Sequence, residues 1–276
     1  MSKVFSPTLI EDFLRRVSVT RSHSTHRSYK SVMNIVANKL QDLPFNEHSL
    51  LYVIEKWKQE VSINTIKYRL IVIIQYLKHT NQYEPWVEDI AKSMASEYTL
   101  QDCPTPDELE KILGKIKNHK YRAILLLMAE SGARVSEVVN IKLEDIHVPQ
   151  GIVVVRNTKN NEDKILRLSK RTLENIMAYR EDERLDTSKT RLFTSKHGEQ
   201  TVIATQKAIK KYCYLAGLSK YHCHSFRHYF AQRLIDNNYS LPIVQKAMGH
   251  KSSKSTERYF KVDYRTVFNA VDGVFN

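Results

Sequence analysis

The sequence predicts a mainly α-helical protein with a small antiparallel β-sheet, arranged as an N-terminal helical bundle and a larger C-terminal domain. Apolar residues recur at intervals of three and four residues between residues 7 and 94, which is the spacing of amphipathic helices. A similar pattern returns beyond residue 106. Between residues 151 and 168, two runs rich in β-branched residues flank a polar turn, which is typical of a hairpin. With 276 residues, 42% of them hydrophobic, the chain can form a core in each of two domains.

The N-terminal domain is predicted to be an all-α bundle of about five helices over residues 1–98. The first helix should begin at Ser6-Pro7, because a serine cap followed by proline favours a helix start. A polar connector then covers residues 20–25. The later helices are expected to begin near Ser24, near Asn46 or Ser49, near Asn64 and near Trp86.

A linker is predicted at residues 99–106, because Pro104 and Pro106 interrupt regular structure. The second domain then covers residues 107–276, and Thr105-Pro106-Asp107-Glu108 has the residue types of a capped helix start. Beyond it we expect helices at 106–117, 120–131, 169–183, 201–216 and 241–248, and two more that carry His224 and Tyr259.

The chain is strongly basic, with 43 Lys and Arg against 30 Asp and Glu and a net charge of +13. Such a charge favours a phosphate-rich partner, although ribosomal, membrane-surface and heparin-binding proteins share it. No apolar run is long enough to span a membrane, and the N-terminus lacks the apolar core of a signal peptide. Three cysteines do not make a disulfide framework. We therefore expect a soluble protein that is cytoplasmic and associated with the nucleoid, or that lies in an intracellular compartment of a host.

Side chains suited to phosphodiester chemistry gather in the last fifth of the chain and around Arg134. His224 and Arg227 are three residues apart, so they share one helical face. His250 and Tyr259 follow in a polar, basic segment. Arg134 follows a glycine turn at the predicted start of a helix, so its planar guanidinium can face a phosphate. Together they supply a base, two cations and a nucleophile, without a metal or other cofactor.

Three sequence motifs, in this order, resemble the tyrosine recombinase (phage integrase) family. Residues 131–137 read Ser-Gly-Ala-Arg-Val-Ser-Glu, where the family has roughly Thr-Gly-x-Arg-x-x-Glu. Residues 224–228 read His-Ser-Phe-Arg-His, for His-x-Leu-Arg-His, and residues 248–250 read Met-Gly-His, for Leu-Gly-His. Tyr259 lies nine residues after His250, as the family's tyrosine does. The departures, such as Phe226 and Met248 for leucine, exchange one apolar residue for another and affect the subgroup rather than the chemistry.

The resemblance implies a site-specific DNA recombinase that cleaves and rejoins strands, and it assigns a role to each matching residue. Tyr259 would be the nucleophile that forms a 3′-phosphotyrosyl link, while Arg134 and Arg227 would clamp the scissile phosphate. His224 would accept the tyrosine proton and His250 would bind a nonbridging oxygen. Glu137 would orient this network.

The family also uses a lysine on a β-hairpin as the acid that protonates the departing 5′-oxygen. Lys159, at the end of the first predicted strand, stands where the resemblance places this lysine. Lys164, at the start of the second strand, is the alternative, because the register of a hairpin cannot be read from sequence.

The resemblance further implies double-stranded DNA with specific sites as the partner and a tetramer on two sites, and it leaves room for an accessory DNA-bending protein. It makes the N-terminal bundle a core-binding, SAM-like domain that closes over DNA, in a compact Xer-like or simple-integrase architecture. The apolar tail from residue 262 could then dock on a neighbouring protomer.

Three other interpretations remain. A type IB topoisomerase would use the same chemistry as a monomer, and a DNA-binding regulator would have lost catalysis. The third is a zinc site, but its possible ligands lack the short, repeated spacing that zinc sites usually show. These ligands are Cys213, His222, Cys223, His224 and His228.

Overall fold

A computed structural model describes residues 4–40, 43–95, 102–156, 163–184 and 190–249. The chain splits into two compact units, Met1–Thr99 and Leu100–Asn276. Both units are mainly helical, and the only strands among the described residues form small antiparallel sheets in the second unit. The predicted fold class is therefore confirmed. No helix in the described part of the chain is both long and apolar enough to cross a membrane.

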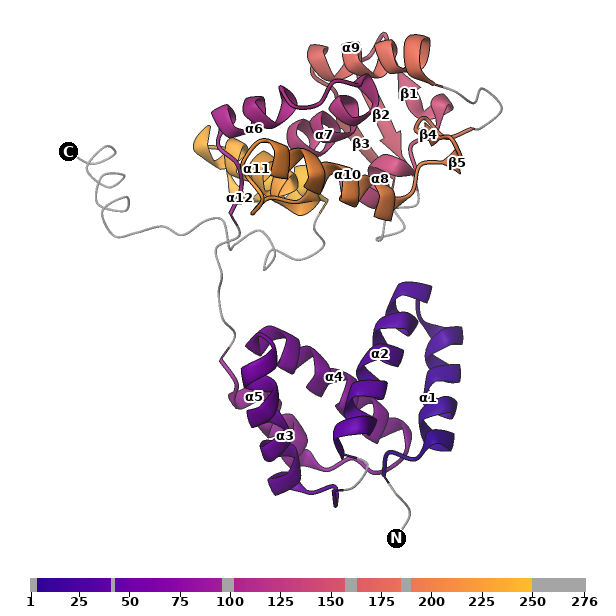
Figure 1. The fold of residues 1–276 in the computed structure, drawn as a ribbon, viewed down its shortest axis with the longest axis vertical. Helices are drawn as coiled ribbons and strands as arrows, with labels where there is room; N and C mark the ends of the chain where they lie inside the picture. The colour runs from indigo at the N-terminus through magenta and orange to yellow at the C-terminus, as the bar shows by residue number, and fades with distance from the viewer. Residues whose placement is uncertain (1–3, 41–42, 96–101, 157–162, 185–189, 250–276) are drawn as a thin grey trace, which may run out of the picture. The chain divides into compact units, whose positions relative to one another are not determined.

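The first unit is a bundle of five helices in the described residues (Figure 1). Their bounds are α1 Pro7–Thr20, α2 His23–Leu40, α3 Glu47–Glu60, α4 Ile63–His79 and α5 Pro85–Ser93. Ser6 caps α1, and Asn46 rather than Ser49 caps α3. Ser62 caps α4 just before the predicted start at Asn64, since its side chain accepts the Thr65 amide.

Helix α4 is at the centre of this bundle, because α1, α2, α3 and α5 all pack against it. Its buried side chains include Ile66, Leu70 and Ile73, all fully enclosed. Burial of a side chain of this size stabilises a fold by ~1.5–3 kcal/mol relative to exposure. The bundle therefore has its own hydrophobic core.

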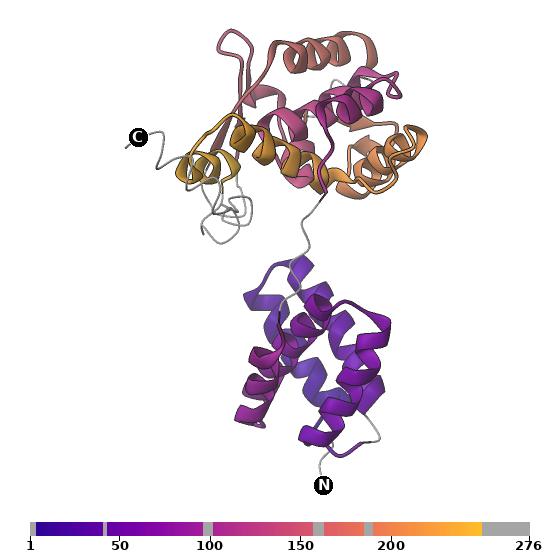
Figure 2. The ribbon, with the colours of Figure 1, turned by 90° about the vertical axis from the view of Figure 1, so that its left-hand side faces the viewer.

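The second unit surrounds α7, a helix whose side chains from Ala123 to Met128 are all buried. A helix that is apolar on every face must be covered on every face, and α8, α9, α10 and α11 all contact α7. In both views α9 lies at the end of this unit away from α12 (Figures 1 and 2). The helices are α6 Pro106–Leu113, α7 His119–Ser131, α8 Val135–Val139, α9 Lys170–Ala178, α10 Val202–Leu215, α11 Cys223–Asp236 and α12 Leu241–Met248.

The predicted start of α6 is confirmed as a capping box. The Thr105 hydroxyl accepts the Glu108 amide, and the Glu108 carboxylate accepts the Thr105 amide at 2.8 Å. The helix ends at Leu113, before the predicted residue 117, because Gly114 caps it. Helix α9 continues as a π-helical turn over Tyr179–Glu183, which completes the predicted 169–183 segment.

The predicted hairpin pairs β2 (Ile152–Val155) with β3 (Lys164–Arg167), and its tip at residues 157–162 lies outside the described residues. Val155 lies opposite Lys164 and Val153 opposite Leu166. Directly paired residues share one face of a sheet. Val153, Val155 and Leu166 are buried, so Lys164 lies on the face that covers the core.

Two further pairings were not predicted. Strand β1 (Ile146–His147) pairs with β2, and β4 (Thr194–Ser195) forms a two-residue ladder with β5 (Gly198–Glu199). Runs of two residues are too short to show a β period in sequence.

Candidate active site

Arg134 is held at the junction of α7 and α8. Gly132 ends α7 in the left-handed conformation, with φ of 65°, and the chain is extended at Arg134. The Glu137 carboxylate accepts both the Arg134 amide, at 2.9 Å, and its guanidinium Nη1, at 2.5 Å. Because Glu137 is only 6% exposed, it fixes both the backbone and the side chain of this arginine.

Arg227 ties together two helix ends that are far apart in the sequence. Its guanidinium donates to the carbonyl of Gly132, at the end of α7, and to that of Met248, at the end of α12, the latter at 2.5 Å. The side chain is 2% exposed, and Gly249 follows Met248 with φ of 62°. These bonds place the three motifs side by side, since each motif contributes one partner.

A cavity of about 630 Å³ opens beside these residues. Arg134, Arg227 and His224 line it, so three of the predicted site residues share one cavity. His224 is exposed on the first turn of α11, and its ring meets the buried His228 ring edge-on at 4.7 Å between centroids. Lys207 and Lys210 of α10 also line the cavity. They were missed, although the spacing of three between exposed lysines on one predicted helix could have indicated them.

Lys164 is the hairpin lysine that the structure describes, and its ammonium nitrogen is buried. Its pKa falls to about 8, chiefly because burial disfavours the charged form and then because Arg227 and Arg134 repel it, while Glu137 opposes the change. A Cβ on Gly249 would lie 3.5 Å from the Lys164 Cδ, so the lysine stem passes beside the end of α12. In the described part of the chain, the Glu137 carboxylate is thus the single anion among three cationic groups, Arg134, Lys164 and Arg227. This excess of positive charge suits an anionic ligand.

The remaining predicted site residues cannot be compared with the structure. Lys159, His250 and Tyr259 lie outside the described residues, as does the tail from residue 262.

The cysteine and histidine residues that could suggest a zinc site do not converge. Among the described residues, no three His, Cys, Asp or Glu side chains are grouped closely enough to hold a metal ion. Burial raises the pKa of Cys213 to about 11 and that of Cys223 to about 12, so both thiols are protonated at neutral pH.

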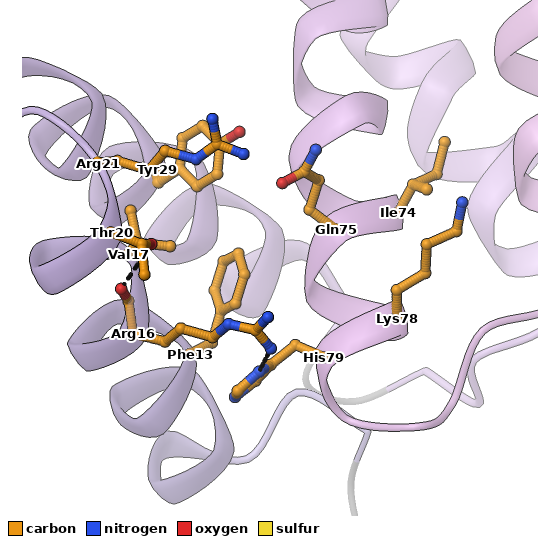
Figure 3. Close-up of a pocket in the computed structure, with 10 residues that line it drawn as sticks. All are labelled: Phe13, Arg16, Val17, Thr20, Arg21, Tyr29, Ile74, Gln75, Lys78 and His79. Carbon is orange, nitrogen blue, oxygen red and sulfur yellow. Dashed lines mark hydrogen bonds between the residues drawn. The ribbon is translucent and has the colours of Figure 1, made fainter.

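A second cavity, of about 500 Å³, lies in the first unit between α1 and α4 (Figure 3). Phe13 points into the gap, and Arg16, Arg21 and Lys78 stand around it. Arg16 Nη1 lies 3.1 Å from His79 Nδ1, and His79 Nε2 lies 2.8 Å from an Asp12 carboxylate oxygen. The rim is therefore basic over an apolar floor, a feature that no local sequence pattern predicts because it joins two helices.

We expect Gly132→Ala to destabilise the second unit by about 2–4 kcal/mol. An added Cβ would overlap Cδ1 of the Phe230 ring, on a backbone that disfavours L side chains. Urea unfolding should show this decrease in the free energy of unfolding. Gly217→Ala is the matched control, because Gly217 has φ of 73° but nothing within 4 Å of its Cβ position, so it should cost about 1 kcal/mol. Equal costs would contradict the steric explanation.

Comparisons with known proteins give a consistent result. The model of the phage integrase family matches residues 104–266. Tyrosine recombinase XerA of Pyrococcus horikoshii is 28% identical over 236 residues, which cover 83% of this chain and 80% of the relative. Tyrosine recombinase XerC of Thermodesulfovibrio yellowstonii is 24% identical over 286 residues, covering 95% and 94%.

Two solved structures share the fold. The Tn1549 transposon integrase in complex with transposon right end DNA superimposes with a TM-score of 0.81 at 15% identity, covering 99% of this chain and all of that chain. A lambda integrase dimer bound to a COC′ core site gives a TM-score of 0.74 at 17% identity, covering 91% and 94%.

Proposed function

The chain belongs to the phage integrase family, and from this premise we propose that it is a site-specific DNA recombinase that cleaves and rejoins strands through Tyr259. One observation carries the proposal: Arg134 and Arg227, from motifs far apart in the sequence, line one cavity with His224. Two guanidinium groups beside an imidazole suit a phosphodiester that is attacked by a hydroxyl group.

The proposed step is a transesterification. The Tyr259 hydroxyl oxygen attacks the phosphorus, the bond from phosphorus to the 5′-oxygen breaks, and a 3′-phosphotyrosyl link forms. His224 accepts the tyrosine proton, because a phenol with a pKa near 10 needs a base at neutral pH. Lys159 gives a proton to the departing 5′-oxygen. A 5′-hydroxyl group from another strand then reverses the step, so no ATP is needed.

The cations stabilise the charge that develops on the nonbridging oxygens in the transition state. Arg134 and Arg227 bind these oxygens, and His250 donates a further hydrogen bond. Each such donor contributes ~3–4 kcal/mol in comparable sites. Glu137 keeps Arg134 extended toward the cavity through its two hydrogen bonds.

The proposed partner is double-stranded DNA with specific recombination sites. Solved structures of similar fold include integrases in complex with DNA, and the net charge of +13 fits a polyanion. We propose a tetramer on two sites, with the tail from residue 262 docked on a neighbour and an accessory DNA-bending protein as a possible further partner. In this assembly the N-terminal bundle is the core-binding domain.

The function is tested by trapping the covalent intermediate. The full chain is mixed with nicked duplexes taken from DNA that flanks its own gene, in EDTA, and the products are separated in SDS. We expect a protein–DNA adduct that resists SDS, whose cross-linked peptide contains Tyr259. Tight DNA binding without any adduct would favour a regulator. Relaxation of an isolated plasmid that lacks a specific site would favour a topoisomerase.

The basic rim of the cavity in the first unit gives a separate prediction. If this rim contacts the DNA backbone, Arg16→Gln and Arg21→Gln should each weaken binding to all duplexes alike. Each should also reduce the slope of log Kd against log salt concentration by about 1. Fluorescence anisotropy at several salt concentrations measures both effects. Lys92→Gln is the control, because Lys92 is paired with Glu88. Equal slopes in all three variants would exclude the rim from the DNA interface.

A further inference from the structure

Lys164 has no role in the transesterification proposed above, and its position in the fold is therefore unexplained. The register of β2 and β3 fixes its place, since it pairs with the buried Val155 at the inner face of the sheet. A lysine at this position cannot easily leave the interior, because its neighbours Val155 and Leu166 hold the strand against the core.

The surroundings of the Lys164 ammonium group are those of an anion site. Its nitrogen is buried, and no atom of the described residues accepts a hydrogen bond from it. The charged groups that act on it are Arg227 from α11, Arg134 from the junction of α7 and α8, and Glu137 from α8. Glu137 already accepts two hydrogen bonds from Arg134, so positive charge is in excess.

A buried ammonium group without an acceptor is costly to a fold, typically by several kcal/mol. A methionine or leucine here would satisfy the packing without that cost. A lysine in such a place therefore indicates a ligand that supplies the missing negative charge.

We propose that Lys164 is a third phosphate-binding cation of this site, which donates a hydrogen bond to the phosphate group that Arg134 and Arg227 hold. This inference rests on the proposed function and deepens it. Lys164 and Lys159 then have different roles: Lys159 protonates the departing oxygen, whereas Lys164 stabilises charge on a nonbridging oxygen. The stem also passes beside Gly249, the glycine of the third motif.

The first experiment needs no knowledge of the DNA site. Thermal unfolding of the full chain is followed at pH 7 with and without inorganic phosphate, for the wild type, Lys164→Met and Lys164→Arg. Lys170→Met is the matched control, because Lys170 is exposed at the start of α9. Without phosphate, we expect Lys164→Met to unfold a few degrees higher than the wild type. Phosphate should raise the unfolding temperature of the wild type and of Lys170→Met, and raise that of Lys164→Met much less.

The pH dependence of this difference follows from the pKa of Lys164, which is lowered to about 8 in the folded protein from an ordinary value of 10.5. Below pH 8 Lys164 is protonated in both the folded and the unfolded protein, and the folded protein bears the full cost of the buried charge. Between these two values the unfolded chain binds more protons, so the wild type gains stability as the pH rises. The advantage of Lys164→Met should therefore shrink across this interval.

The second experiment separates Lys164 from Lys159 in the adduct assay. A substrate with sulfur in place of the bridging 5′-oxygen has a leaving group that needs no protonation. Sulfur should restore adduct formation to Lys159→Met. Lys164→Met should remain about 100-fold slower than the wild type with either substrate, and Lys164→Arg should recover part of the loss.

Three results would overturn the proposal: equal stabilisation of the wild type and Lys164→Met by phosphate, adduct formation by Lys164→Met at the wild-type rate, or restoration of Lys164→Met by sulfur. The last would make Lys164 the proton donor. If the wild type itself forms no adduct, the proposed recombinase function fails, while the phosphate experiment still decides whether Lys164 binds phosphate.

Discussion

Tyr259→Phe is expected to form no covalent adduct with DNA and to reduce strand cleavage by at least about 10⁴-fold. The substitution keeps the aromatic ring and removes the one atom that attacks phosphorus. DNA affinity should change by less than about twofold, because a single neutral hydroxyl group adds little to binding that rests on phosphate contacts. The measurement is the SDS-resistant adduct, with anisotropy on the same duplex.

Tyr264→Phe is the matched control, since it removes a second phenol from the same segment of the chain. It should form the adduct at the wild-type rate. If Tyr264→Phe lost the adduct and Tyr259→Phe kept it, the assignment of the nucleophile would be wrong. Loss of the adduct in both variants would indicate that the fold of this segment needs both phenols, and would not identify the nucleophile.

The second large effect is expected at Arg227. We expect Arg227→Lys to slow adduct formation by about 10²–10³-fold, although the charge is kept. The guanidinium donates to the carbonyls of Gly132 and Met248 from two different nitrogens, and its planar fork also lines the cavity. An ammonium group cannot span these partners at once. The rate of adduct formation at saturating DNA isolates this defect from binding.

The same substitution should lower the free energy of unfolding by about 1–3 kcal/mol, because two carbonyls lose a donor. Arg233→Lys is the control on the same helix: Arg233 is half exposed and pairs with Asp236. Arg233→Lys should leave the rate of adduct formation and the free energy of unfolding equal to those of the wild type within experimental error. A rate for Arg227→Lys within fivefold of the wild type would show that charge alone is sufficient at this position.

The sequence predicted the features that depend on local patterns. The cap at Ser6, the capping box of Thr105 with Glu108, and the hairpin over residues 151–168 were all expected, because each is encoded by a few neighbouring residues. The spacing of three predicted that His224 and Arg227 share a helical face, whereas their convergence with Arg134 was expected only from the resemblance. Their shared cavity is a property of tertiary packing.

What was missed depends on long-range contacts. Nothing local shows that the Lys164 stem passes beside the end of α12, since a shift of one residue in register would turn it to solvent. Lys207 and Lys210 look like ordinary surface lysines until α10 packs against α8 beside the site. The basic rim between α1 and α4 likewise needs two helices to be brought together.

The two carbonyls that Arg227 engages have a consequence for how the site opens and closes. Because one side chain joins the ends of α7 and α12, unwinding of either end breaks one of the two bonds that hold the Arg227 guanidinium in place. Slow amide hydrogen exchange at the two ends should therefore report a single opening event rather than two. Local opening of either end would displace Arg227 and so separate it from Arg134. The protein would therefore alternate between a complete phosphate site and none, without partly formed sites.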